Sequence, residues 1–236
     1  MEFAELREIA WQANQELHRR GLAPLTWGNA SAADRTAGVF AIKPSGVAYE
    51  QLRMEDIVVV ALDDGRVVSG RLRPSSDTPT HRALYLGFPE IGGVVHTHAL
   101  HATAWAQLGR PLPCLGTTHA DHFRGAVPVA RELTEAEIAA GYEAACGAAI
   151  VETFRRAACQ PLDVPAVFLA GHGPFTWGAS ASDAVRHAEV LEAVARMALL
   201  MGAHLREVGE LAEPLRRKHF ERKHGPKAYY GQEALP

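Results

Sequence analysis

Long apolar runs and cysteine pairs are scarce in this sequence. No uninterrupted apolar stretch reaches the roughly 18 residues that a membrane-spanning helix requires. The N-terminus has acidic residues and no apolar segment, so it lacks the pattern of a secretory signal peptide. The three cysteines, Cys114, Cys146 and Cys159, are odd in number and lie outside any C-x-x-C pattern. These absences together favour a reducing, cytoplasmic location.

A strong excess of charge is also missing. The 236 residues carry a formal net charge of -3, which gives no overall attraction to nucleic acid or to an anionic membrane, so any basic site must be local. The glycine-containing loop at 43–46 matches neither a Walker loop nor a G-x-G-x-x-G fingerprint, which disfavours a nucleotide-binding fold. With 47% hydrophobic residues, no repeats and no low-complexity linker, the sequence predicts one α/β or α+β domain over residues 1–236.

Apolar periodicity divides the chain into alternating helices and strands. The sequence predicts helices over 2–20, 81–86, 101–108, 134–158 and 182–208. It predicts strands over 39–42, 57–62, 66–68, 94–98 and 164–169, and a strand or turn over 175–178. The Asp64-Gly65 pair between two of these strands favours a hairpin, and therefore antiparallel pairing at that place.

Two histidines one residue apart, His96 and His98, follow the apolar pair Val94-Val95. Side chains alternate along a strand, so both imidazoles would point to the same side, within reach of one ion. Neutral imidazole is a common zinc ligand, and a catalytic zinc typically keeps about three protein ligands. A pair alone is weak evidence, because surface or core histidines explain it more often than a metal. His172 makes a ligand set more plausible, since glycines flank it at the end of another predicted strand.

Small and polar residues occur beside the predicted strands. The loop at 43–46 could cradle an anion with backbone amides, and Lys43 would add charge. Residues 75–77 precede a predicted helix and suit helix caps. They could also contact an anionic group, with Asp77 facing a metal, and neither interpretation excludes the other. The glycine and asparagine at 28–29 suit a close approach of the backbone to a ligand, although a turn is the simpler interpretation.

Two later stretches are rich in titratable side chains. The loop at 113–122 places histidine and aspartate side by side, and such groups become acid/base candidates when they lie beside a metal site. The segment 214–225 is basic and weakly periodic. It is either a solvated tail or a segment that folds over a neighbouring subunit and brings charge to an anionic substrate. The aromatic pair Tyr229-Tyr230 would be unusual in a purely solvated tail.

Over nearly the whole chain these stretches resemble the class II (metal-dependent) sugar-phosphate aldolase/epimerase family. The resemblance rests on five motifs: Trp27-Gly28-Asn29, Lys43-Pro44-Ser45-Gly46, Ser75-Ser76-Asp77-Thr78-Pro79-Thr80-His81, His96-Thr97-His98 and Ala170-Gly171-His172-Gly173. The order of these motifs is specific for the superfamily. Two further stretches, 116–121 and 222–232, resemble the epimerase branch and favour epimerisation over simple aldol cleavage.

The resemblance implies a mixed α/β fold with a central, mainly antiparallel sheet flanked by helices. It implies bound zinc, with manganese as the alternative, and a fourfold-symmetric homotetramer in which the segment from about 214 to 236 packs at a subunit interface. The implied metal ligands are Asp77, His96, His98 and His172. The implied substrate contacts, largely to a phosphate, are Gly28, Asn29, Lys43, Ser45, Gly46, Ser75 and Ser76. The implied acid/base pair is Asp121 and Tyr230, with His219 assisting.

The implied activity is epimerisation of a ketopentose phosphate at C4, through cleavage and re-formation of the C3–C4 bond. Two alternatives remain. One is a sugar-phosphate aldolase of the L-fuculose-phosphate type, and the other is a non-catalytic, adducin-like interaction domain, which the complete ligand set argues against. Binding of nucleic acid by the basic tail is disfavoured, because no recognised binding motif accompanies it.

Overall fold

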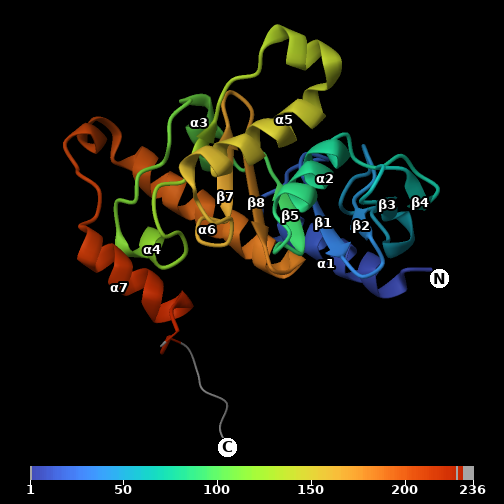
Figure 1. Ribbon diagram of the computed structural model, residues 1–236, viewed down its shortest axis with the longest axis horizontal. Coiled ribbons are helices and arrows are strands. Elements are labelled where there is room, and N and C mark those ends of the chain that lie inside the picture. The colour runs from blue at the N-terminus through green and yellow to red at the C-terminus, as the bar shows by residue number, and fades with distance from the viewer. Residues whose placement is uncertain (1, 227, 231–236) are drawn as a thin grey trace, which may run out of the picture.

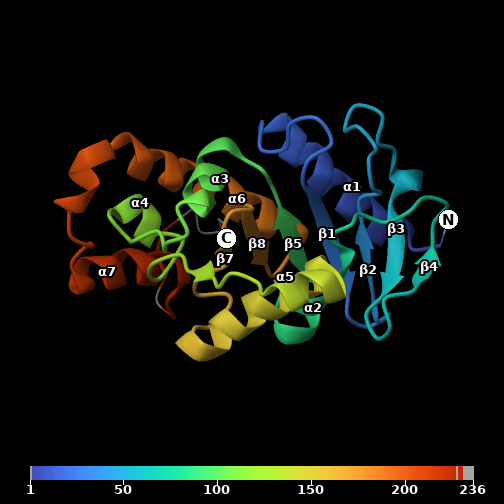
Figure 2. The same ribbon diagram turned by 90° about the horizontal axis from the view of Figure 1, so that it is seen from above.

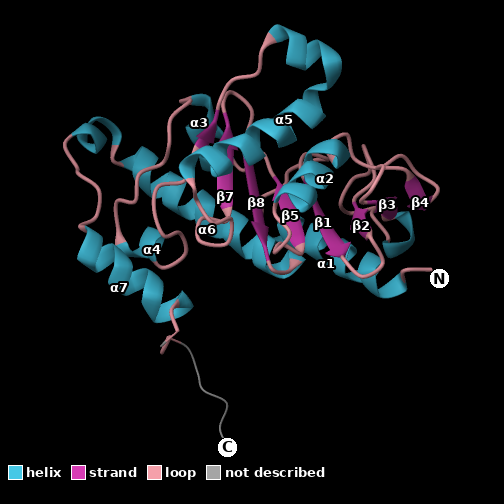
Figure 3. Ribbon diagram, in the orientation of Figure 1, coloured by secondary structure: helices cyan, strands magenta, loops and turns pink. Residues whose placement is uncertain are grey.

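An eight-stranded sheet forms the centre of the computed structural model, which describes residues 2–226 and 228–230 (Figures 1 and 3). The strand order is β4-β3-β2-β1-β5-β8-β7-β6, and every pair of neighbours is antiparallel except β6 and β7. The strands are β1 (Asn29–Asp34), β2 (Val39–Ile42), β3 (Val58–Ala61), β4 (Val67–Ser69), β5 (Gly93–His96), β6 (Val129–Ala130), β7 (Ala166–Leu169) and β8 (Pro174–Gly178). The predicted mixed α/β class with a mainly antiparallel sheet is confirmed.

Helices cover both faces of this sheet (Figure 2). They are α1 (Ala4–Arg19), α2 (Thr78–Gly87), α3 (Leu100–Gln107), α4 (Thr117–Ala120), α5 (Glu135–Ala157), α6 (Ala181–Leu200) and α7 (Glu213–His224), with short 3-10 turns at η1 (Met54–Asp56) and η2 (Gly202–Arg206). Alternation along β5 sends Val94 into the core beneath α2 and α5, and Val95 into the core beneath α1. Among the described residues, no helix has the length and apolar character needed to cross a membrane.

The start of α6 lies so close to the sheet that only glycine fits beneath it. A Cβ atom on Gly93 of β5 would lie 2.3 Å from the Cα atom of Ala181, and one on Gly178 of β8 would lie 2.4 Å from the Cβ atom of Asp183. A close-packed interior cannot take up such an overlap without backbone shifts. The first turn of α6 therefore holds β5 firmly in place, and β5 is the strand that ends at His96.

Helix α5 begins conventionally and then bends. Thr134 accepts a hydrogen bond from the backbone N–H of Glu137, whose side chain accepts in return from the backbone of Thr134, so the predicted capping box is confirmed. Gly141 then leaves helical geometry, with φ 153° and ψ 92°. Glycine tolerates this conformation because it has no Cβ atom. The bend separates the first turns of α5 from the longer part that packs on α2 (Figure 1).

Several stretches differ from the sequence-based expectation. The predicted loop over 113–122 contains the short helix α4, and the predicted helix over 182–208 ends earlier and continues as the turn η2. The segment 214–225 forms helix α7, which packs on α4 and buries Phe220, so it is not a solvated tail. Charged residues surround that single buried aromatic, which is why apolar periodicity did not indicate the helix. Within the stretch 222–232, residues 227, 231 and 232 lie outside the described residues.

Candidate active site

A pocket of about 650 Å³ opens at one end of the sheet, where β2 and β5 end and β1 and β8 begin. Every residue predicted to bind metal or substrate lines it. These residues are Gly28, Asn29, Lys43, Ser45, Gly46, Ser75, Ser76, Asp77, His96, His98 and His172. The fold thus brings together the five motifs that are far apart in the sequence, and it does so at the ends of neighbouring strands.

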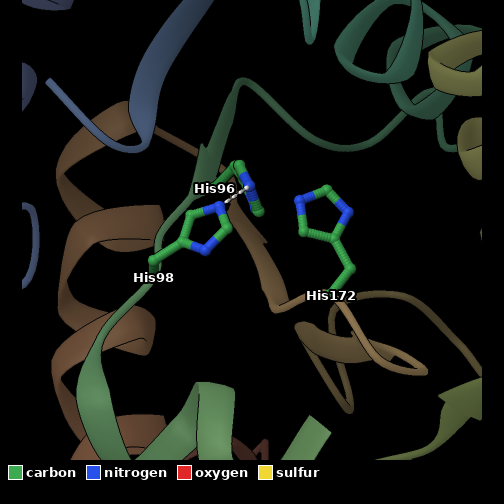
Figure 4. A group of neighbouring side chains, drawn as sticks. All are labelled: His96, His98 and His172. Atoms are coloured by element: carbon green, nitrogen blue, oxygen red, sulfur yellow. Dashed lines mark hydrogen bonds between the residues drawn. The ribbon is translucent and has the colours of Figure 1, made fainter. Parts of the chain in front are cut away.

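Two of the histidines meet at the end of β5 (Figure 4). His96 is the last residue of the strand and His98 lies beyond it, so the strand is shorter than predicted, yet their Nε2 atoms are only 3.1 Å apart. The Nδ1 atom of His96 lies 2.9 Å from the carbonyl oxygen of Pro174. A carbonyl can only accept, so Nδ1 carries the proton and Nε2 keeps its lone pair. Burial lowers the pKa of His96 to about 4, which keeps the ring in its neutral, ligating form.

His172 completes a three-histidine cluster from the turn between β7 and β8. The ligand atoms of His96, His98 and His172 all lie within 4.8 Å of one another, and the three rings converge on one point in Figure 4. A Cβ atom on Gly173 would lie 2.9 Å from the carbonyl oxygen of Thr97, so glycine lets this turn lie against the chain after β5. Burial lowers the pKa of His98 and of His172 as well. Three neutral imidazoles in this arrangement fit one divalent transition metal and leave it open coordination positions.

Tyr142 contacts this cluster, although sequence reasoning did not single it out. Its hydroxyl lies 2.9 Å from the Nδ1 atom of His172, and the two rings stack with their centres 5.9 Å apart. Burial raises the pKa of Tyr142 to about 12, so the hydroxyl keeps its proton. The hydrogen bond occupies Nδ1 and leaves Nε2 of His172 for a metal. Glu143 also lines the pocket. The sequence feature that could have indicated both residues is Gly141, which precedes them inside an alanine-rich helix.

Asp77 lies in the pocket beside Asn29. The amide nitrogen of Asn29 donates to the carboxylate of Asp77 at 2.6 Å and to the hydroxyl of Ser75 at 3.0 Å. Asp77 is the N-cap residue of α2 but makes no side-chain capping bond, so capping does not account for it. Among the described residues, the group within 4.8 Å comprises the three histidines without Asp77, and its role as a fourth ligand stays a prediction.

One buried acceptor in the pocket is free. The amide oxygen of Asn29 is buried, and it has no hydrogen-bond partner among the residues that the structure describes. A buried polar atom without a partner is costly, so native proteins nearly always pair such atoms. The oxygen is therefore suited to accept a hydrogen bond from a bound molecule.

Lys43 brings a buried positive charge to the same pocket. It is 1% exposed, and its Nζ atom lies 4.8 Å from the centre of the Tyr49 ring. Burial lowers the pKa of Lys43 to about 8, so the ammonium is still protonated at neutral pH. The backbone N–H of Ser45 donates to the carbonyl of Arg73, which leaves the hydroxyl of Ser45, and not its amide, for an anion. Of the expected backbone cradle, this bond excludes the Ser45 amide, and a role for the other amides of that loop stays a prediction.

Gly28 is required by its position. Its φ is 75°, and a Cβ atom would lie 2.6 Å from the carbonyl oxygen of His96. Tyr49 donates a hydrogen bond from its hydroxyl to the carbonyl of Gly28 at 2.9 Å, which holds this segment from the other side. The sequence left a turn and a close approach to a ligand as alternatives. The structure shows that Gly28 lies against the backbone of His96, and its approach to a ligand stays a prediction.

The predicted acid/base residues form a second group. The Nδ1 atom of His219 lies 3.0 Å from the Oδ1 atom of Asp121, and the ring of Tyr230 lies near them on the chain after α7. None of the three is among the described residues that line the pocket. Figure 1 shows α4 and α7, which carry this group, together at one end of the molecule and away from β5. Within one chain, the predicted site is therefore divided between two places.

The fold and the site have relatives among known proteins. A family model described as "Class II Aldolase and Adducin N-terminal domain" matches residues 8–199, so the chain belongs to this family. The chain is 52% identical over 228 residues to an L-ribulose-5-phosphate 4-epimerase, UlaF, of Salmonella paratyphi B, and the match covers 97% of this chain and 99% of that protein.

Solved structures with the same fold include class II aldolases. An L-fuculose 1-phosphate aldolase is similar with a TM-score of 0.76 and 26% identity, over 92% of this chain and 95% of that one. The L-fuculose-1-phosphate aldolase of Thermus thermophilus is similar with a TM-score of 0.66 and 26% identity, over 87% and 99% of the two chains. The resemblance found in the sequence motifs is thus confirmed over nearly the whole chain.

We expect Tyr142→Phe to weaken metal binding, because the orienting hydrogen bond to His172 is lost while the ring remains. Loss of such an outer partner typically costs about 10- to 100-fold in metal affinity. Competition against a chromogenic chelator measures the dissociation constant directly. Ile138→Ala, an exposed side chain one turn earlier in α5, is the control and should leave the constant unchanged. Equal affinity of Tyr142→Phe and the control would contradict the orienting role.

Proposed function

We propose that this chain is a metal-dependent L-ribulose-5-phosphate 4-epimerase, which interconverts L-ribulose 5-phosphate and D-xylulose 5-phosphate. The observation that carries the proposal is the 52% identity to a protein of that name, over 97% of this chain and 99% of the relative. A pocket that combines a three-histidine cluster with a buried lysine fits the chemistry, because this substrate carries both hydroxyl oxygens and a phosphate.

The metal would be held by His96, His98 and His172, with Asp77 as a fourth ligand. Zinc is the proposed ion because neutral imidazole is one of its preferred ligands, and manganese is the alternative. When bound, such an ion supplies a Lewis acid that stabilises negative charge on substrate oxygens as a bond breaks. The hydrogen bonds to the Pro174 carbonyl and the Tyr142 hydroxyl support this assignment, since each occupies the Nδ1 side of its histidine.

The substrate contacts follow from the reaction. C4 of a ketopentose phosphate has no carbonyl beside it, so direct removal of its proton is difficult. Cleavage of the C3–C4 bond avoids that step, and it produces glycolaldehyde phosphate, which must turn over before the bond re-forms. Lys43 and the hydroxyls of Ser45, Ser75 and Ser76, beside Gly46, would hold the phosphate so that the aldehyde rotates without leaving. The free amide oxygen of Asn29 would accept a hydrogen bond from a substrate hydroxyl.

Asp121 and Tyr230 would be the proton-transfer groups, one for each face of the aldehyde, with His219 assisting through Asp121. Because they lie away from the pocket of their own chain, they would act in the pocket of an adjacent subunit. Tyr230 is 62% exposed, so it is available to such a neighbour. We propose a fourfold-symmetric homotetramer, as the family resemblance implies, with the segment from about 214 at the interface, because each subunit can then serve the next around a closed ring.

An aldolase of the L-fuculose-phosphate type is the second candidate, and the structural similarity to two such enzymes favours it. It would release the aldehyde and would not add it back. An adducin-like interaction domain without catalysis is the third. The three-histidine cluster with oriented rings argues against a purely structural role.

Incubation of metal-loaded protein with L-ribulose 5-phosphate, followed by NMR, tests the proposal. We expect D-xylulose 5-phosphate to appear, and its formation to stop after treatment with a chelator and to return with added zinc. Accumulation of free glycolaldehyde phosphate without re-addition would indicate an aldolase. No turnover by fully metallated protein would rule out the epimerase and lead to a screen of 1-phosphorylated ketoses.

We expect Asp121→Asn and Tyr230→Phe each to lower kcat by about 100-fold or more, the usual contribution of a positioned proton-transfer group. Bound metal, measured by atomic absorption, should stay near one ion per subunit, because both variants keep His96, His98 and His172 intact. Loss of the metal in either variant would contradict the acid/base assignment.

The same variants test the division of the site between subunits. Subunits with Asp121→Asn and subunits with His98→Asn are each expected to be inactive alone. Hybrids formed by unfolding and refolding the mixture should regain part of the activity, because some pockets then combine an intact histidine cluster with an intact Asp121. If the mixtures stay inactive after assembly, the histidine cluster and Asp121 of the same chain act in one site.

We expect kcat/KM to fall as the pH rises above about 8, because Lys43 then loses the proton that attracts the phosphate. Burial lowers the pKa of Lys43 into this range. Below that pKa the side chain is a charged ammonium, and above it the side chain is a neutral amine. Lys43→Arg should remove the alkaline fall, since arginine stays protonated throughout this range. Lys218→Arg, outside the pocket, is the control and should keep it. A wild-type profile that stays level well beyond pH 8 would speak against phosphate binding by Lys43.

A further inference from the structure

Arg222 on α7 contacts both of the residues proposed for proton transfer. Its guanidinium donates from Nε to Oδ1 of Asp121 at 2.8 Å and from Nη2 to Oδ2 of the same carboxylate. The guanidinium carbon lies 5.0 Å from the centre of the Tyr230 ring, within the range of a cation–π contact. The backbone carbonyl of Arg222 accepts hydrogen bonds from the N–H groups of Tyr229 at 3.0 Å and Tyr230 at 3.1 Å.

The backbone and the side chain of Arg222 thus position two different residues. The backbone carbonyl fixes where the chain after α7 turns, and hence where the backbone of Tyr230 lies. The forked side chain fixes the plane of the Asp121 carboxylate, because two parallel N–H···O bonds to one carboxylate allow little rotation. Lys223 cannot replace this function, since its Nζ atom is 3.8 Å from Oδ2 and supplies only a point charge.

The remaining contacts of Asp121 leave one acceptor position open. Its Oδ1 atom accepts from Arg222 and from His219, while its Oδ2 atom accepts from Arg222 alone among the described hydrogen bonds. Each carboxylate oxygen offers about two lone-pair sites. The Oδ2 atom therefore keeps a site at which a substrate hydroxyl could deliver a proton.

The surroundings of Asp121 keep it ionised. Burial opposes its charge, but the hydrogen bonds from Arg222 and His219 and the charge of Lys223 outweigh burial and hold the pKa of Asp121 below its usual value. Among the described residues, two further titratable groups face it: His224, whose Nε2 atom lies 2.9 Å from the backbone carbonyl of Asp121, and His122, whose ring lies 3.4 Å from the Lys223 ammonium.

We propose that Arg222 is a positioning residue that holds Asp121 and Tyr230 as one preassembled acid/base unit. The inference rests on the proposed function, since it takes these two residues as the proton-transfer groups. Arg222 acts through them and does not itself touch the substrate. A unit formed within one chain keeps its internal geometry fixed while the subunits assemble around the pocket.

The test compares Arg222→Met, Arg222→Lys and the control Arg66→Met. Arg66 lies outside the segment proposed for the interface, is exposed, and contacts Asp64 at 3.6 Å. For Arg222→Met we expect kcat to fall by about 100-fold, with KM changed by less than about threefold, because an interaction used for chemistry is lost and substrate binding is not. Arg66→Met should match the wild-type protein.

The pH profile separates positioning from mere support of the fold. Loss of the guanidinium should raise the pKa of Asp121 and move the acidic limb of kcat upward by about one pH unit or more. Arg222→Lys restores the positive charge, so the acidic limb of kcat should move most of the way back to its wild-type pH. The value of kcat should stay reduced, because lysine lacks the two parallel N–H donors of the guanidinium. A limb that stays in place in Arg222→Met, or a kcat within about threefold of wild type, would overturn the inference.

A measurement that needs no substrate tests the role of Arg222 independently of the proposed function. Carboxyl 13C NMR follows the titration of Asp121 in the full chain, with Asp121→Asn used to assign its signal. An upward shift of that titration in Arg222→Met is expected whatever the substrate is. If the wild-type protein does not convert L-ribulose 5-phosphate but the shift is present, the proposed function fails and the hold of Arg222 on Asp121 stands. If the protein turns over and the shift is absent, the positioning role alone fails.

Discussion

The pairing of β5 with its two neighbours is the constraint on which the pocket depends. In this register Asn29 of β1 lies opposite His96 on one side, and Phe175 of β8 lies opposite His96 on the other. Because β8 begins at Pro174, the turn before it returns His172 to the same point. A slip of one residue would move His96 to the opposite face of the sheet and separate the histidines. The glycines beneath α6, which let the helix lie directly on β5 and β8, oppose such a slip.

Burial then gives the grouped side chains different charges. The same desolvation that lowers the pKa of His96 to about 4 lowers that of Lys43 only to about 8, so near neutral pH the pocket holds neutral ligands beside a cation. Asp121 shows the opposite balance, since its partners outweigh burial and keep it anionic. The proposed metal ligation, phosphate attraction and proton transfer each need one of these states, and burial together with neighbouring side chains sets all three.

Much of this arrangement was predictable from short patterns. The H-x-H pair, the glycines around His172 and the Asp64-Gly65 turn identified strand ends and antiparallel pairing, because local chemistry determines such features. Tyr142 was not predictable, since its contact with His172 depends on a bend inside a helix. Helix α7 was missed for a related reason: its packing depends on contacts to Asp121 from residues about 100 positions later in the chain. The roles of the acid/base residues came from family resemblance, and no local pattern would have supplied them.

The edges of the sheet have a consequence for how copies of this chain can meet. The strands at the two edges are β4, with three residues, and β6, with two, which are the shortest among the described strands. An edge strand offers unpaired backbone groups on which another chain can add a strand, and short edges offer few of them. Extension of the sheet from one subunit to the next is therefore disfavoured, as is the fibrous aggregation that such extension starts. Assembly through helices and loops remains, and these elements carry Asp121 and His219, which are predicted to take part in proton transfer.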